Sequence, residues 1–131
     1  MQKALLKTGK IIYPNNLKIN KKFKIGIIGS GKMAKNYIEV IKSYNHEISA
    51  IVSLSNNQNA KKLAKRHNSK LFNNYKSAII ERDIVDAWIV CCSWDQIAKC
   101  LKFFLKTKKP LLVEKSITIN SINLNKLHKK N

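Results

Sequence analysis

Short apolar runs alternate along this chain with longer segments in which apolar residues recur every three or four positions. The runs predict strands at 23–28, 47–54, 70–72, 85–92 and 110–113. The other segments predict helices at 32–44, 59–67, 75–80, 94–106 (or 95–106) and 121–129. Strands that alternate with helices form a parallel sheet with right-handed crossovers. We therefore predict an α/β fold, a doubly wound parallel sheet of about five strands.

Helical spacing also predicts which side chains face the sheet. The inner stripe of the helix at 32–44 is expected to hold Met33, Tyr37, Val40 and Ile41, and that of the helix at 94–106 to hold Ile97, Cys100, Leu101 and Phe104. Trp88, in the middle of an apolar run, is expected to pack in the core. Residues 1–21 form a basic leader with one turn signal, so the folded domain is expected at 22–131.

The first predicted strand runs into a Gly-x-Gly-x-x-Ala turn that opens a helix. Gly29 would make the tight turn, and Gly31 would let the backbone approach a pyrophosphate. Ala34 would let the helix pack closely on the strand. The N–H groups and the positive dipole of the helix N-terminus would then face the phosphates. This layout predicts a dinucleotide-binding turn, and the alternative is an ordinary tight turn between strand and helix.

The 131 residues carry a net charge of +19, yet the pattern of charge does not favour a nucleic-acid-binding protein. Nearly all the basic residues are lysines that are spread along the chain, and Arg66 and Arg82 are the only arginines. Dedicated nucleic-acid surfaces usually gather arginine and aromatic side chains in one patch. A lysine-rich composition also follows from AT-rich codons. We therefore expect solvated lysine faces and no specific nucleic-acid binding.

Three cysteines, Cys91, Cys92 and Cys100, lie in or after an apolar run. Their spacing does not match a zinc site, and neighbouring cysteines rarely bridge each other, so we predict reduced thiols, no metal and a cytoplasmic protein. Cys91 is interpreted as a core residue. The chain shows no signal peptide and no apolar run of the ~20 residues that a membrane span needs, so we expect no membrane partner.

Two further landmarks follow the glycine turn. Residues 86–92 read Asp-Ala-Trp-Ile-Val-Cys-Cys, and residues 109–116 read Lys-Pro-Leu-Leu-Val-Glu-Lys-Ser. The glycine turn and these two segments follow one another in the order found in the glucose–fructose oxidoreductase / inositol dehydrogenase / MocA (Gfo/Idh/MocA) family. Residues 22–131 therefore resemble that family. The resemblance implies a Rossmann domain that binds NAD or NADP. It also implies hydride transfer between that dinucleotide and a sugar or cyclitol hydroxyl.

The resemblance also implies roles for single residues. Lys115 would be catalytic, because it would reach the nicotinamide and the reacting hydroxyl. Glu114 would lie near the nicotinamide ribose. The other cofactor-binding residues implied are Gly29, Ser30, Gly31, Lys32, Met33, Ala34, Ser53, Ser55, Cys92, Ser93 and Trp94. Trp94 could equally be a wall of the cofactor site or a packing residue at the start of its helix.

The chain departs from the family pattern in several places. Ser93 and Ser116 stand where the family usually has proline, and no acid follows the second strand, which ends in Ser53-Leu54-Ser55. A carboxylate there would bind the ribose 2′-hydroxyl of NAD, so its absence slightly favours NADP. The printed chain stops at Asn131, before the family's second, substrate-binding domain. We therefore expect half of a site, completed by a separate chain or lost, so that the alternative is a non-catalytic dinucleotide-binding module.

Overall fold

Five parallel strands form one sheet in the computed structural model, which describes residues 4–5, 11–12, 21–55 and 58–114. The strands are β3 (Lys24–Ile28), β4 (Glu47–Val52), β5 (Lys70–Phe72), β6 (Ala87–Val90) and β7 (Leu111–Val113). Their order in the sheet is β5-β4-β3-β6-β7, and every neighbouring pair is parallel. The order therefore reverses between β3 and β6, which is the point where doubly wound sheets bind their ligands.

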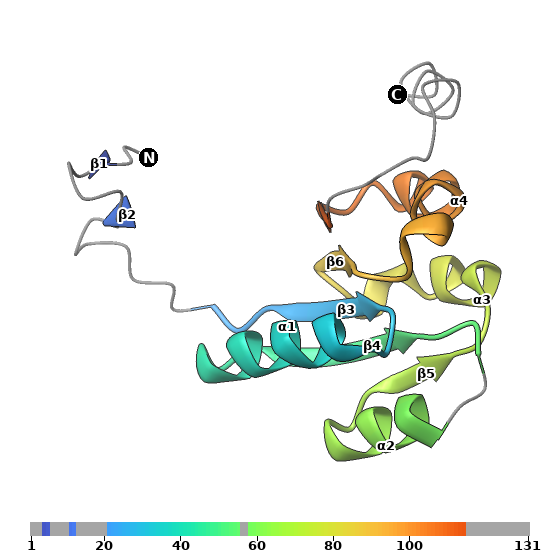
Figure 1. The fold of residues 1–131 in the computed structure, drawn as a ribbon, viewed down its shortest axis with the longest axis horizontal. Helices are drawn as coiled ribbons and strands as arrows, with labels where there is room; N and C mark the ends of the chain where they lie inside the picture. Colours follow the sequence, from blue (N-terminus) through green and yellow to red (C-terminus); the bar gives the residue numbers. More distant parts are fainter. Residues whose placement is uncertain (1–3, 6–10, 13–20, 56–57, 115–131) are drawn as a thin grey trace.

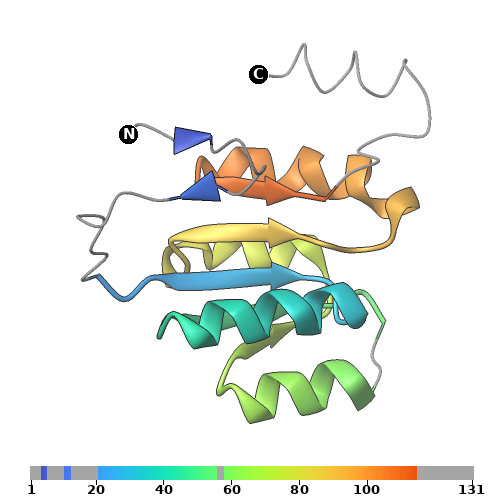
Figure 2. The same cartoon turned by 60° about the vertical axis from the view of Figure 1, so that its left-hand side comes forward.

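Helices cover both faces of the sheet (Figures 1 and 2). They are α1 (Lys32–Ser43), α2 (Gln58–Arg66), α3 (Tyr75–Ile80) and α4 (Trp94–Phe104), with short 3-10 turns at Arg82–Ile84 and Leu105–Thr107. One core cluster joins α1 and α2 to the sheet through residues such as Ile38, Leu63 and Ile51. The other joins α3 and α4 to the opposite face through Ala78, Cys100 and Val90. The chain therefore winds along one face, then along the other.

The structure confirms the predicted fold class, and four of the five strands of the sheet are shorter than the runs that predicted them, whereas β5 has the predicted bounds. The run at 85–92 supplies only Ala87–Val90, and the run at 47–54 supplies only Glu47–Val52. Within the expected leader, β1 (Ala4–Leu5) and β2 (Ile11–Ile12) pair in antiparallel fashion, which the sequence did not predict. The helix expected at 121–129 lies outside the described residues.

The predicted inner stripe of α1 was wrong in part. Ala34 and Ile38 are buried, whereas Met33 is 45% exposed and Val40 is 57% exposed. Tyr37 and Ile41 pack against the same cluster as Ala34, as expected. Relative to the prediction, α1 is rotated about its axis so that Ala34 faces the sheet, where its small side chain permits close packing. In α4, by contrast, all four predicted stripe residues are buried.

Trp88 is fully buried, as predicted, and its ring needs space that Gly26 provides. The two residues are register partners on β6 and β3. A Cβ on Gly26 would lie 2.3 Å from Cε3 of Trp88 and 2.9 Å from Cγ1 of Val85. The indole also packs edge-on against the ring of Phe104, with 4.7 Å between the ring centroids. Because Gly26 has no side chain, the indole of Trp88 fits against β3 and at the same time packs against Phe104 of α4.

We predict that Gly26→Ala destabilises the protein by about 2–3 kcal/mol, because the new methyl group overlaps the indole and Val85. Urea unfolding monitored by tryptophan fluorescence measures the effect. Gly31→Ala is the matched control, because a Cβ at Gly31 meets no atom within 4 Å. Equal stability of the two variants would contradict this view of the core.

Candidate functional site

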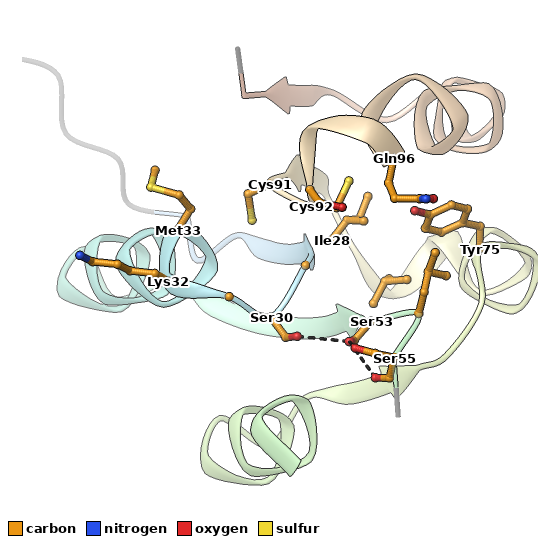
Figure 3. A pocket seen from close by; sticks show the side chains of 15 residues that line it. Ile28, Ser30, Lys32, Met33, Ser53, Ser55, Tyr75, Cys91, Cys92 and Gln96 are labelled. Carbon is orange, nitrogen blue, oxygen red and sulfur yellow. Dashed lines mark hydrogen bonds between the residues drawn. The ribbon is translucent and has the colours of Figure 1, made fainter. Parts of the chain in front are cut away.

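A cavity of about 620 Å³ opens at the carboxyl ends of β3, β4 and β6, where the strand order reverses (Figure 3). Its volume lies within the roughly 300–1,000 Å³ that is typical of small-molecule and cofactor sites. The lining residues are Ile28, Gly29, Ser30, Gly31, Lys32, Met33, Val52, Ser53, Leu54, Ser55, Tyr75, Cys91, Cys92, Ser93 and Gln96. The sheet thus brings the glycine turn to the end of β4 and to the loop after β6.

Gly29 makes the tight turn that the sequence predicted. Its φ angle is +122°, a conformation that residues with a Cβ rarely adopt. A Cβ on Gly29 would also lie 2.8 Å from the carbonyl oxygen of Cys91. The Gly29 N–H donates a 2.8 Å hydrogen bond to the carbonyl of Val52. The turn is therefore held between β4 and β6, and only glycine fits there.

Gly31 is the N-cap residue of α1 and lies on the cavity. A Cβ built on it meets no protein atom within 4 Å, so the space above its Cα is open. No side chain caps the α1 N-terminus, and its first turn has no acidic residue. The backbone N–H groups of this turn can therefore serve an anionic ligand. Behind them Ala34 is fully buried, as its expected packing role requires.

Hydroxyl groups gather at the end of β4 beside the glycine turn (Figure 3). The Ser30 and Ser53 oxygens are 3.2 Å apart, and the Ser53 hydroxyl donates a 3.0 Å hydrogen bond to the carbonyl of Ser55. Ser53 is buried, whereas Ser55 is exposed. None of the described residues that line the cavity is Asp or Glu. This end of the cavity therefore offers hydroxyls to a ribose or a phosphate and repels neither.

The loop after β6 supplies the opposite wall of the cavity. Cys91, Cys92 and Ser93 line it, together with Gln96 from the first turn of α4. Burial is the main cause that raises the pKa of Cys91 to about 12, so this thiol stays protonated near neutral pH. A hydrogen bond from Cys100 is the main cause that lowers the pKa of Cys92. Trp94 begins α4, is 60% exposed and does not line the cavity.

The sequence did not point to Tyr75 or Gln96 as lining residues. Tyr75 begins α3, and Asn74 caps that helix by accepting a 2.8 Å hydrogen bond from the Ser77 N–H. The cap directs the first turn of α3 toward the cavity, where burial raises the pKa of Tyr75 well above its usual value. Asn before an apolar helical segment is a capping signal, but it does not indicate what the following side chain contacts.

Glu114 directly follows β7, and its backbone N–H donates a 3.0 Å hydrogen bond to the carbonyl of Val90 on β6. Its carboxylate accepts a hydrogen bond from the hydroxyl of Tyr37 on α1. Glu114 is not among the residues that line the cavity. Lys115, the predicted catalytic residue, lies outside the described residues, as does Ser116.

Two further observations limit what the described part of the chain can hold. No three His, Cys, Asp or Glu side chains among its residues lie close enough to bind a metal ion together. None of its helices is long and apolar enough to cross a membrane.

The sequence model of the oxidoreductase family with an NAD-binding Rossmann fold, Gfo/Idh/MocA, matches residues 23–130. No protein in a curated collection matches the chain. Solved structures do match it at the level of the fold, and all three described below are less than 25% identical to it.

The first is myo-inositol dehydrogenase from Lactobacillus casei in complex with NAD(H) and myo-inositol (TM-score 0.75, 19% identity, 84% of this chain and 33% of that chain covered). The second is the WlbA dehydrogenase from Bordetella pertussis in complex with NADH and UDP-GlcNAcA (0.73, 14%, 83% and 33%). The third is a 3-ketoreductase from Actinomadura kijaniata with NADP and TDP-benzene (0.69, 23%, 83% and 35%). The chain spans about a third of the length of these structures.

Proposed function

We propose a function for this chain, which belongs to the Gfo/Idh/MocA oxidoreductase family with its NAD-binding Rossmann fold. It is the nucleotide-binding half of an NAD(P)-dependent oxidoreductase that acts on a sugar or cyclitol hydroxyl. One observation carries the proposal: the open backbone of Gly31 lies on the large cavity at the switch point of the sheet. Complexes of similar structures with myo-inositol and with UDP-GlcNAcA support the substrate class.

The lining residues fit a dinucleotide. Gly29, Ser30, Gly31, Lys32 and Met33 would hold the pyrophosphate, with the α1 N-terminus as the main source of N–H donors. The hydroxyls of Ser53 and Ser55 would face the adenine-side ribose, and Cys92 and Ser93 would cover the opposite side of the cofactor. The predicted contact of Trp94 with the cofactor stays a prediction, because Trp94 is 60% exposed at the start of α4 and does not line the cavity. Ala34 supports the turn from behind.

The catalytic step is assigned to Lys115, which follows Glu114 in the sequence. A bound nicotinamide would supply the hydride acceptor or donor. Lys115 would orient the reacting hydroxyl and assist its proton transfer, and Glu114 would lie near the nicotinamide ribose. The other wall of the substrate site would come from a second domain or a separate chain. We place the protein in the cytoplasm, since Cys91, Cys92 and Cys100 are free thiols in the structure.

The second candidate function is a dinucleotide-binding module without turnover. It is favoured by the glycine turn, because the N-terminus of α1 has no side-chain cap and no acid in its first turn, so it can bind phosphates whether or not hydride transfer follows. Binding of the cofactor without turnover, even in the presence of a substrate-binding domain of the family, would select this candidate. DNA binding with a steep salt dependence and no effect of NADH would instead select a nucleic-acid function.

We predict that Gly31→Val abolishes dinucleotide binding and leaves the fold intact. The branched side chain meets no protein atom at its Cβ, yet it would occupy the space of the pyrophosphate. Fluorescence titration with NADH and NADPH measures binding, and circular dichroism checks the fold. Gly31→Ala is a graded control with a smaller loss. Unchanged affinity of a folded Gly31→Val variant would contradict the cofactor site.

We predict that NADPH binds at least as tightly as NADH. No carboxylate of the lining opposes a 2′-phosphate, and Lys61 and Lys62 lie on the helix that follows Ser55. Ser55→Asp should make the chain bind NADH more tightly than NADPH. The new carboxylate repels the 2′-phosphate of NADPH and accepts a hydrogen bond from the 2′-hydroxyl of NADH. Parallel titrations of both cofactors at physiological salt test this. A clear preference of the unmodified chain for NADH would contradict it.

We predict no appreciable turnover of sugars or cyclitols by the 131-residue chain alone. Hydride transfer requires the donor carbon to be held close to the nicotinamide and shielded from water, which takes two walls. Cofactor reduction is followed by absorbance over a panel of polyols, with Lys115→Ala in parallel. Robust turnover that disappears in Lys115→Ala would show that the chain carries a complete site.

A further inference from the structure

Tyr37 and Glu114 are 77 residues apart in sequence, yet the Tyr37 hydroxyl donates a hydrogen bond to the Glu114 carboxylate. Tyr37 lies on α1, less than two turns after the glycine turn, and Glu114 directly follows β7. Both side chains are partly buried. Cys91, at the end of β6, lies near both groups. The contact therefore spans the carboxyl edge of the sheet from the first helix to the last described strand.

This contact gives Glu114 a second anchor. Its backbone is already fixed to β6 through the hydrogen bond to the Val90 carbonyl. Because Tyr37 bonds the side chain as well, both the backbone and the carboxylate of Glu114 have a hydrogen-bond partner in an element that packs in the sheet or on it. The helix that presents its N-terminus to the cavity thus also fixes the residue that precedes Lys115. A residue held by packing and by a hydrogen bond is placed more precisely than one on an unsupported loop.

We propose that Tyr37 is a positioning residue that orients the Glu114 carboxylate toward the nicotinamide-side ribose of the cofactor. This inference rests on the proposed dinucleotide function and adds to it a residue that no sequence motif of the chain singles out. Tyr37 acts only through Glu114. Its effect is therefore confined to the nicotinamide half of the ligand and does not extend to the adenosine half.

The protonation state of Tyr37 suits this role. The hydrogen bond to Glu114 is the main cause that raises its pKa from 10.0 to about 12, and burial and the charges of Glu114 and Cys91 add to it. The phenol therefore remains a donor throughout the neutral range. Because the folded pKa exceeds the unfolded value, the bond stabilises the fold fully below pH 10. That contribution is lost as the pH rises through about 12.

Tyr37→Phe removes the hydroxyl and keeps the ring that packs against the core. We compare its affinity for NADPH and NADH with its affinity for ADP, which has the adenosine and pyrophosphate groups but no nicotinamide-side ribose. The expected result is about tenfold weaker binding of the dinucleotides, the usual scale for loss of a hydrogen bond to a charged group, and unchanged binding of ADP. Tyr44→Phe is the matched control, since Tyr44 is an exposed tyrosine at the end of the same helix.

Glu114→Gln and the double variant complete the cycle. If Tyr37 acts through Glu114, the double variant binds the dinucleotides no more weakly than Glu114→Gln alone. Tyrosine ionisation is followed by near-ultraviolet absorbance as the pH is raised. The difference between the unmodified chain and Tyr37→Phe should show one phenol that titrates near pH 12. In Glu114→Gln the pKa of that phenol should fall toward 10. The titration reports the contact directly, independently of ligand binding.

Equal weakening of ADP and dinucleotide binding by Tyr37→Phe would overturn the inference, because it would indicate a general effect on the fold. Unchanged dinucleotide affinity would overturn it too. If the unmodified chain binds ADP but discriminates against both dinucleotides, or binds none of the three, the proposed function itself fails. The two failures are therefore distinguishable from the unmodified chain alone.

Discussion

The geometry of the site depends on one steric constraint, the close approach of Gly29 to the end of β6. Its φ of +122° is a conformation that residues with a side chain rarely adopt. A Cβ added to Gly29 would also lie only 2.8 Å from the carbonyl oxygen of Cys91. The N–H of the same residue is bonded to Val52 on β4. The ends of three strands thereby meet at one residue, and the chain must leave the sheet in the direction that begins α1. A single Cβ here would separate the turn from the loop that forms the opposite wall.

The cavity follows from how the chain winds around the sheet. From β3 it winds through α1, β4 and α2 to β5, packing one face, and it then returns through α3, β6 and α4 to β7 on the other face. The connections after β3 and β6 therefore leave in opposite directions, and no segment of the described chain covers the space between them. Parallel strands place all their carboxyl ends at this edge. The same winding that builds two cores thus leaves an opening lined by the glycine turn, by serine hydroxyls and by apolar side chains such as Val52.

Periodicity and turn chemistry predicted the fold and the glycine turn, because those features depend on neighbours in sequence. The family resemblance implied the other predicted residues that line the cavity, such as Ser53 and Cys92. The prediction that Met33 and Val40 face the sheet was wrong. Both belong to the apolar side of α1, but the close packing of Ala34 on the sheet determines which part of that side is buried. Gly26 gave no signal, because its reason is the indole of Trp88 on another strand. Tyr37 and Glu114 meet across 77 residues, a contact that no local pattern reports. The role of Lys115 stays a prediction.

The positions of the few acidic residues bear on how this strongly basic chain can distinguish one anionic ligand from another. Only seven Asp and Glu residues stand against 26 Lys and Arg, and several acids have structural partners. Asp86 accepts a 2.8 Å hydrogen bond from the Lys24 N–H, Glu81 pairs with Lys70, and Glu114 accepts from Tyr37. None of them lies on the cavity. The overall charge attracts any anion from a distance, at a rate that salt reduces. Selection among anions must therefore come from the site itself, where backbone N–H groups and serine hydroxyls are fixed by Gly29 and by β4.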